Sequence, residues 1–240
     1  MLIMIRPAMW LTAVYVLAAV LPAIFLLYYI YQRDRVEREP ASLLMSLLWK
    51  GVLAALCSMV LETVGQLVLD ALVPEGTLLH TVLLAFVVVA MAEEGMKFFF
   101  LKRRTWYDYN FNYRFDAIVY SVFVSLGFAA FENIQYVFRY GLSVALPRAL
   151  LALPGHMAFA VFMGVYYGRA KLRYDCGQTG AAGSDLLMAY FVAVLLHGFY
   201  DACAMIATTK ATVLFVVFVV ITYVRMFRTV KRESNQDTPV

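Results

Sequence analysis

The chain consists of long apolar stretches separated by short segments rich in charged residues. A helix needs about 20 mostly apolar residues to cross the hydrocarbon core of a bilayer. Seven stretches approach or exceed that length, at residues 7–30, 43–69, 78–101, 115–137, 150–168, 186–207 and 212–226. The pattern predicts an all-α, polytopic transmembrane helix bundle with about seven spanning helices, and the length leaves room for an eighth.

Composition supports this class of protein. Hydrophobic residues make up 63% of the chain and charged residues only 15%, whereas soluble domains carry roughly 45–50% and about 25%. This difference excludes a soluble enzyme. The formal net charge of +4 does not indicate nucleic-acid binding, because the basic residues cluster at the ends of apolar stretches. Three cysteines, two of them in apolar stretches, indicate no disulfide framework.

The basic residues predict the orientation in the membrane. If the N-terminus is outside, 14 of the 20 Lys and Arg residues fall in cytoplasmic segments and only Arg6, Arg139, Arg148 and Lys210 fall outside. Cytoplasmic loops are richer in Lys and Arg. The sequence therefore predicts a multi-pass protein of the cell membrane, with its C-terminus cytoplasmic. The first stretch could instead be a cleaved signal peptide, but its length and basic flank favour a retained span.

The expected domain organisation is simple. Residues 1–228 form a single integral-membrane domain. Residues 229–240 are polar and lack periodicity, so we expect a disordered cytoplasmic tail there. The sequence carries no internal repeat, phosphate-binding loop or dinucleotide-binding motif.

Ionisable residues inside the apolar stretches are the candidate functional groups. Each costs roughly 2.5–3.5 kcal/mol at the bilayer centre on insertion scales, so each suggests a function and a partner. In the third stretch Glu93 and Glu94 are adjacent, and Lys97 lies one turn beyond Glu93 on the same helix face. Two carboxylates beside an amine suit general acid–base chemistry. A structural ion pair between Glu93 and Lys97 is the alternative, but it leaves Glu94 without a partner.

The fourth stretch adds a third buried carboxylate. Glu132 lies one turn after Phe128 and beside Asn133, and Gly127 allows a neighbouring helix to approach closely. An interhelical hydrogen bond, or hydration near the outer interface, is the alternative explanation for Glu132. Asn133 is expected to join helices rather than take part in chemistry.

Two histidines complete the set. His156 follows a Pro–Gly dipeptide that should disturb the helix and free backbone groups to line a cavity. His197 and Asp201 are spaced by four residues, so the carboxylate can hold the imidazole tautomer or join it as a metal ligand. The alternatives are a histidine satisfied within the core for His156 and a structural hydrogen bond between His197 and Asp201.

A polar stripe in the second stretch has a simpler explanation. Glu62, Gln66 and Asp70 are spaced by four residues close to the predicted outer interface, where water reaches them. We expect a solvated helix end there, with a mild effect of the substitution Glu62→Gln. His80 is expected at the interface as well.

Four motifs follow one another on successive stretches: EExxK at 93–97, FxxxE at 128–132, PGH at 154–156 and HxxxD at 197–201. Each is weak alone, but four in this order on separate helices are specific. In this combination the chain resembles the PrsW family of intramembrane proteases, which shares a superfamily with the CAAX-processing endopeptidases. The similarity covers most of residues 20–205.

The resemblance implies hydrolysis of a peptide bond in a membrane-anchored substrate. PrsW makes the first (site-1) cut in a membrane-anchored anti-sigma factor, which leads to release of a stress sigma factor. The implied partner is a single-span membrane protein within the lipid bilayer, by analogy an anti-sigma factor, and no nucleic acid. The wider superfamily usually has His and Asn where this chain has Glu132 and Asp201, a departure typical of PrsW.

Two mechanisms would use the same side chains. In a metal-free mechanism one of the adjacent glutamates deprotonates water with help from Glu132. His197 with Asp201 then stabilises the oxyanion, and His156 orients water or substrate. In a metal-dependent mechanism Zn²⁺ is held by the two histidines and by Glu132 or Asp201, while one of the adjacent glutamates acts as base. The sequence leaves both open.

Depth along the helices predicts where the substrate is cut. At 1.5 Å per residue, most candidates fall between the midplane and the outer surface, which predicts cleavage near the extracytoplasmic end of the substrate. Glu93 and Glu94 come out up to about 10 Å deeper, which helix tilt, a kink at Gly95 or a misplaced start of the third stretch would explain.

Two other functions compete with proteolysis. Intramembrane Asp, Glu and His residues also form the proton relays of transporters, although many transporters carry repeats between their halves and this sequence does not. A non-catalytic scaffold or sensor could bind tethered clients through the same cavity. The complete set of motifs argues against the scaffold.

Overall fold

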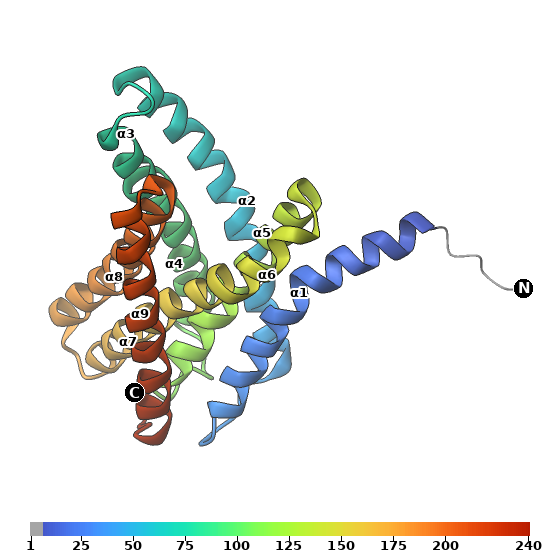
Figure 1. Ribbon diagram of the computed structural model, residues 1–240. Helices are drawn as coiled ribbons and strands as arrows, with labels where there is room; N and C mark the ends of the chain where they lie inside the picture. Colours follow the sequence, from blue (N-terminus) through green and yellow to red (C-terminus); the bar gives the residue numbers. More distant parts are fainter. Residues whose placement is uncertain (1–6) are drawn as a thin grey trace, which may run out of the picture.

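The structure is a computed structural model that describes residues 7–240. Within them, seven helical segments are long and apolar enough to span a membrane, which confirms the predicted bundle (Figure 1). The spans are α1 (Pro7–Arg33), α2 (Ala41–Leu72), α3 (Leu78–Leu83) with η1 (Leu84–Ala90) and α4 (Met91–Thr105), α5 (Asp116–Tyr140), η2 (Leu142–Val144) with α6 (Ala145–Pro147), η3 (Arg148–Ala152) and α7 (Leu153–Asp175), α8 (Thr179–Ile206) and α9 (Thr209–Asn235). Arg6 lies outside the described residues.

Helix α5 is the centre of the bundle. Of its most apolar 18-residue window, 78% is buried inside the protein, against 17–22% for α1, α2 and α9. Its contact with α2 depends on two glycines. A Cβ atom on Gly51 would lie 2.1 Å from the Val124 carbonyl oxygen, and one on Gly127 would lie 2.4 Å from the Leu48 carbonyl oxygen. Small residues at such contacts let helix backbones approach closely in a membrane.

Two π-helical segments interrupt the spans near the predicted site. η1 precedes α4 and η3 precedes α7, and each ends about one turn before a candidate residue, Glu93 in α4 and His156 in α7. π-Helical turns are rare and occur frequently at functional sites. The irregularity in the third span therefore lies in η1, not at Gly95, which sits within regular α4. In the fifth span, Pro154 has no N–H to donate to the preceding turn, and η3 occupies that turn.

The C-terminal residues differ from the expected disordered tail. Helix α9 continues to Asn235, and the remaining residues run along the loop between α4 and α5. The Arg114 N–H donates to the Thr238 carbonyl at 3.0 Å, and the Val240 N–H donates to the Asn112 carbonyl at 2.9 Å. These contacts order the tail through backbone hydrogen bonds, which its polar composition does not reveal.

The α1–α2 loop, at the same end of the bundle as this tail, contains two buried carboxyl groups. Asp34 and Glu39 are only 1% and 5% exposed, and burial raises the pKa of Asp34 to about 6 and that of Glu39 to about 7. The Glu39 N–H donates to the Asp34 carboxylate at 3.3 Å. One oxygen of each carboxyl group is buried without a hydrogen-bond partner, so ionising either group costs stability.

Candidate active site

The ammonium group of Lys97 lies at the centre of the candidate site. Its Nζ atom donates to Glu93 Oε2 at 3.0 Å and to Glu94 Oε1 at 2.7 Å, and it lies 3.2 Å from His156 Nδ1. The same atom is 3.9 Å from the centroid of the Phe128 ring, within cation–π distance. An ammonium has three N–H donors, so these three acceptors use all of them.

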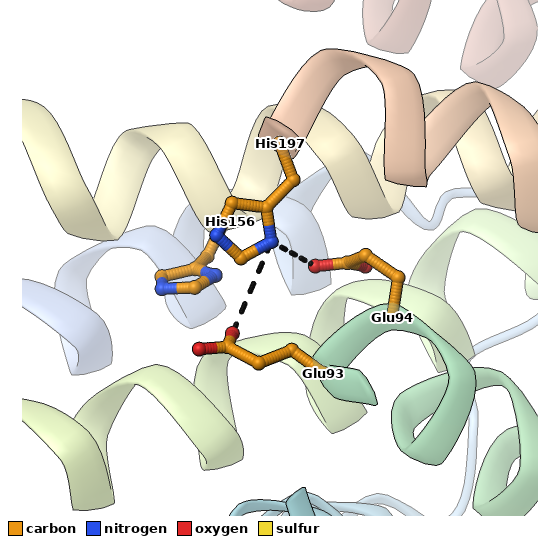
Figure 2. Close-up of side chains that lie close together, drawn as sticks. All are labelled: Glu93, Glu94, His156 and His197. Atoms are coloured by element: carbon orange, nitrogen blue, oxygen red, sulfur yellow. Dashed lines mark hydrogen bonds and ion pairs between the residues drawn. The ribbon is translucent and has the colours of Figure 1, made fainter. Parts of the chain in front are cut away.

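His197 links the acidic pair on α4 to the end of α8. Its Nδ1 atom lies 2.9 Å from Glu94 Oε1 and 3.9 Å from Glu93 Oε2, and its Nε2 atom lies 3.3 Å from Asp201 Oδ2. Figure 2 shows the two carboxylates converging on the same ring nitrogen. Both nitrogens face carboxylate oxygens, so each carries a hydrogen when those carboxylates are ionised. The ring stacks on Phe159, with centroids 5.0 Å apart, and it would have to lose the hydrogen on Nδ1 to bind a metal ion.

His156 faces the acidic residue of α5 with its other nitrogen. Its Nε2 atom lies 3.2 Å from Glu132 Oε2, and the same oxygen accepts a hydrogen bond from Arg148 at 2.7 Å. Because the Lys97 ammonium can only donate, His156 Nδ1 accepts and Nε2 carries the hydrogen that faces Glu132. The rings of His156 and His197 lie edge to face, 5.3 Å apart.

The predicted site residues therefore meet at one place. The two glutamates and Lys97 come from α4, Glu132 and Phe128 from α5, His156 from α7, and the His197–Asp201 pair from α8. Asn133 joins helices, as expected: its amide donates to the Ala19 carbonyl of α1 at 2.8 Å, and its oxygen accepts from Arg148 at 2.6 Å.

A cavity of about 540 Å³ opens beside this cluster. Glu93, Glu132, His156, His197 and Asp201 line it, whereas Glu94 does not. The remaining wall includes Glu62 and Arg148 but is otherwise largely apolar, and it comes mainly from η3 and the facing parts of α7, α8 and α9. The two adjacent glutamates are thus distinguished by position, because one faces the cavity and the other is completely buried.

Comparison with known proteins identifies the family. Residues 39–226 match the family described as PrsW family intramembrane metalloprotease. The chain belongs to the PrsW family. Protease PrsW of Clostridioides difficile is 32% identical over 85% of both chains. Protease PrsW of Geobacillus kaustophilus is 36% identical over 77% of this chain and 76% of that protein. Protease PrsW of Halalkalibacterium halodurans is 30% identical over 92% and 97%. No solved structure gives a significant match.

These matches support a PrsW-type intramembrane peptidase. The family description also names a metalloprotease, which requires side chains that can bind a metal ion. One ligand atom from each of Glu93, Glu94, His156 and His197 lies within 4.8 Å of all the others. Two imidazoles with carboxylate oxygens are a donor set that suits Zn²⁺. Glu94 Oε2 is buried without a hydrogen-bond partner, so it has a free lone pair to offer. The side chains of this PrsW protein therefore supply a donor set for a divalent metal, and an ion bound there would displace the Lys97 ammonium from Glu93, Glu94 and His156.

This group differs from the ligand set predicted for the metal mechanism. That set contained Glu132 or Asp201. In the structure Glu132 faces Nε2 of His156 and Asp201 faces Nε2 of His197, so both carboxylates lie outside the group of four. Such a position is typical of residues that orient a metal-binding imidazole. The two adjacent glutamates take the place expected for Glu132.

Two residues of the site were missed by the sequence analysis. Arg148 was counted as an outer-loop charge, yet it pairs with Glu132 and its guanidinium lies 3.9 Å from the centroid of the Tyr136 ring. Its position shortly before the PGH motif was the only signal in the sequence. Glu62 was expected at a solvated helix end, yet it lines the cavity and its Oε1 atom is buried. Asp70, further along the same stripe, pairs instead with His80 at 2.8 Å.

Proposed function

We propose that this PrsW-family peptidase makes the first (site-1) cut in a single-span membrane protein, an anti-sigma factor of a stress-response pathway, near the extracytoplasmic side of the bilayer. The observation that carries the proposal is the convergence of two adjacent glutamates and two histidines from three spans beside a cavity. Membership of a family of proteases does not favour the transporter or the scaffold. The single-span substrate and its sigma-factor context rest on the family resemblance.

The location of the cavity supports an extracytoplasmic cut. Most of its lining comes from the C-terminal halves of α2, α5 and α8, from η3 with the start of α7, and from the start of α9, and the middle of the third span adds Val89 and Glu93. Apart from the third span, these segments share one end of the bundle. The bias of basic residues toward the loops at the opposite end supports an outside location for this end and thus an N-terminus outside the cell.

The positions of the two glutamates suggest different roles for them. We assign His156, His197 and the completely buried Glu94 as the residues that would hold a divalent metal. This is the set of three protein ligands typical of catalytic zinc. When bound there, such an ion would polarise the scissile carbonyl and make water more acidic. Glu93 faces the cavity and is left to act as general base.

Hydrolysis of the peptide bond consumes one water molecule. A water molecule in the cavity gives one proton to Glu93 as its oxygen attacks the scissile carbonyl carbon. Arg148 lies on the same cavity wall and favours the developing oxyanion electrostatically. The carbon–nitrogen bond breaks, and the proton held by Glu93 passes to the departing amine. The products are a carboxylic acid and an amine, which become a carboxylate and an ammonium group when the second proton of the water passes to the amine.

Purified protein in proteoliposomes tests the proposal. We expect it to cleave a single-span reporter within a few residues of its outer membrane end, as located by mass spectrometry of the fragments. Glu93→Gln should reduce the rate by at least roughly a hundredfold, since general acid–base catalysis contributes about 10²–10⁴. Glu75→Gln is the matched control, because Glu75 is exposed in the α2–α3 turn. A cut on the cytoplasmic side, or full activity of Glu93→Gln, would overturn the proposal.

A further inference from the structure

One carboxylate in the wall of the cavity differs from the others. Glu93 pairs with Lys97, Glu132 with Arg148, and Asp201 with His197. Among the described residues, Glu62 has no such cation: the side chain is partly buried, Ser58 is its hydrogen-bonding neighbour, and its buried Oε1 atom accepts no hydrogen bond. It nevertheless lines the same cavity. Its position is therefore not explained by an internal ion pair.

A carboxylate without a cationic partner is costly inside a membrane protein. Loss of water from a charged group costs several kcal/mol unless a partner replaces the water, and unpaired intramembrane charges are rare unless they serve a function. Val88 of η1 packs against Gly65, about one turn from Glu62, where an added Cβ would lie 3.1 Å from a Val88 methyl group. The α2 helix is thus held close to η1, and Glu62 is fixed at the cavity wall.

The charged side chains of the cavity indicate which kind of group would pair with the Glu62 carboxylate. Four acidic side chains line it, but Arg148 is the only Lys or Arg that does so among the described residues, and it is already engaged by Glu132 and Asn133. The apolar wall provided by Phe159, Tyr200 and Phe215 suits the aliphatic part of a long side chain. Lys and Arg combine such an apolar stem with a cationic end.

We propose that Glu62 is a specificity-determining residue that binds the cationic side chain of a Lys or Arg next to the scissile bond of the substrate. This inference rests on the proposed proteolytic function and adds a substrate class to it. A basic residue at the outer membrane end of a single-span helix can extend its stem along the apolar wall. The cationic end of that side chain then donates a charge-assisted hydrogen bond to the Glu62 carboxylate and neutralises its charge.

The test is a set of single-span reporters in proteoliposomes. Each reporter carries Lys or Gln at one of several successive positions around the mapped cut. We expect the wild type to cleave the reporter with Lys at one position roughly ten- to a hundredfold faster than its Gln counterpart, the range of a hydrogen bond to a charged group. In Glu62→Gln this ratio should fall to about one, and in Glu62→Lys a reporter with Glu at that position should be preferred.

Two controls keep the two proposals separate. Glu75→Gln should keep the wild-type ratio, because Glu75 is exposed outside the cavity. If the wild type cleaves the reporters but the Lys-to-Gln ratio is near one at every position, or if Glu62→Gln leaves a high ratio intact, the specificity proposal is refuted and the protease proposal stands. If no reporter is cleaved by the wild type, both are refuted.

Discussion

Removing the Lys97 ammonium should destabilise the protein strongly, because three buried acceptors depend on it. Lys97 is 2% exposed, and Lys97→Met keeps an unbranched stem while removing the charge. At an effective dielectric constant of about 20, each of its contacts with Glu93 and Glu94, at 3.0 and 2.7 Å, is worth roughly 5–6 kcal/mol before desolvation. Breaking a buried pair by removing one partner costs about 3–5 kcal/mol.

The measurement is the free energy of unfolding in mixed micelles, with a chelator present so that no metal replaces the ammonium. Lys50→Met is the matched control, since Lys50 is only partly buried and its one recorded contact is a cation–π distance of 5.8 Å to Phe100. That contact should be worth about 0.5–1 kcal/mol. Lys97→Met should therefore lose at least about 2 kcal/mol more than the control.

A rescue experiment distinguishes charge from packing. Adding Glu93→Gln and Glu94→Gln to Lys97→Met removes the two uncompensated charges, so most of the lost stability should return. If Lys97→Met costs no more than Lys50→Met, the proposed central position of the ammonium is refuted. If the triple variant is as unstable as Lys97→Met alone, lost packing rather than charge explains the effect.

Three further predictions concern the metal, the loop carboxyl groups and the helix contact. Purified protein should contain about one zinc ion per chain by elemental mass spectrometry, and Glu94→Gln should weaken zinc binding more than tenfold; a metal-free wild type with full activity would refute the ligand assignment. The raised pKa of Glu39, about 7, means that the folded state binds its proton more tightly than the unfolded state, so this contribution to stability is complete below about pH 4.5 and is lost as the pH rises through 7. Glu39→Gln should therefore raise the melting temperature at pH 8 relative to the wild type but not at pH 5, whereas Glu75→Gln should do neither; an equal effect at both pH values contradicts the reasoning. Gly127→Ala should destabilise by about 1–3 kcal/mol, because its Cβ would lie 2.4 Å from the Leu48 carbonyl oxygen; unchanged thermal unfolding would show that α2 and α5 are not packed this closely.

Local sequence patterns predict much of the site because its motifs lie within single helices. The spacing of Glu93 and Lys97 places them on one face before any tertiary structure is known. The spacing of His197 and Asp201 does the same, and the two residues do lie 3.3 Å apart. Apolar length likewise predicts all seven spans. These features depend on helix periodicity and on the thickness of the bilayer.

Contacts between distant segments could not be predicted in this way. Arg148 reaches Glu132 only because the chain turns at Gly141 between α5 and η3. The φ of Gly141 is +84°, a conformation that glycine adopts easily because it has no Cβ atom. Glu62 was predicted to be solvated from its position near the outer end of the second stretch. The sequence does not reveal which other helices face it across the cavity. The tail beyond Asn235 is held by backbone hydrogen bonds, which composition does not encode.

The most direct test of the central claim is a comparison of membrane-protein N-termini in cells that carry the wild type or the Glu93→Gln/Glu94→Gln double variant at matched abundance. Cells should be compared under several envelope stresses, with N-terminal peptides quantified by mass spectrometry. We expect at least one new N-terminus, at the extracytoplasmic flank of a single-span protein, that is present only with the wild type. Identical profiles under every stress would contradict the assignment of these glutamates to a proteolytic site.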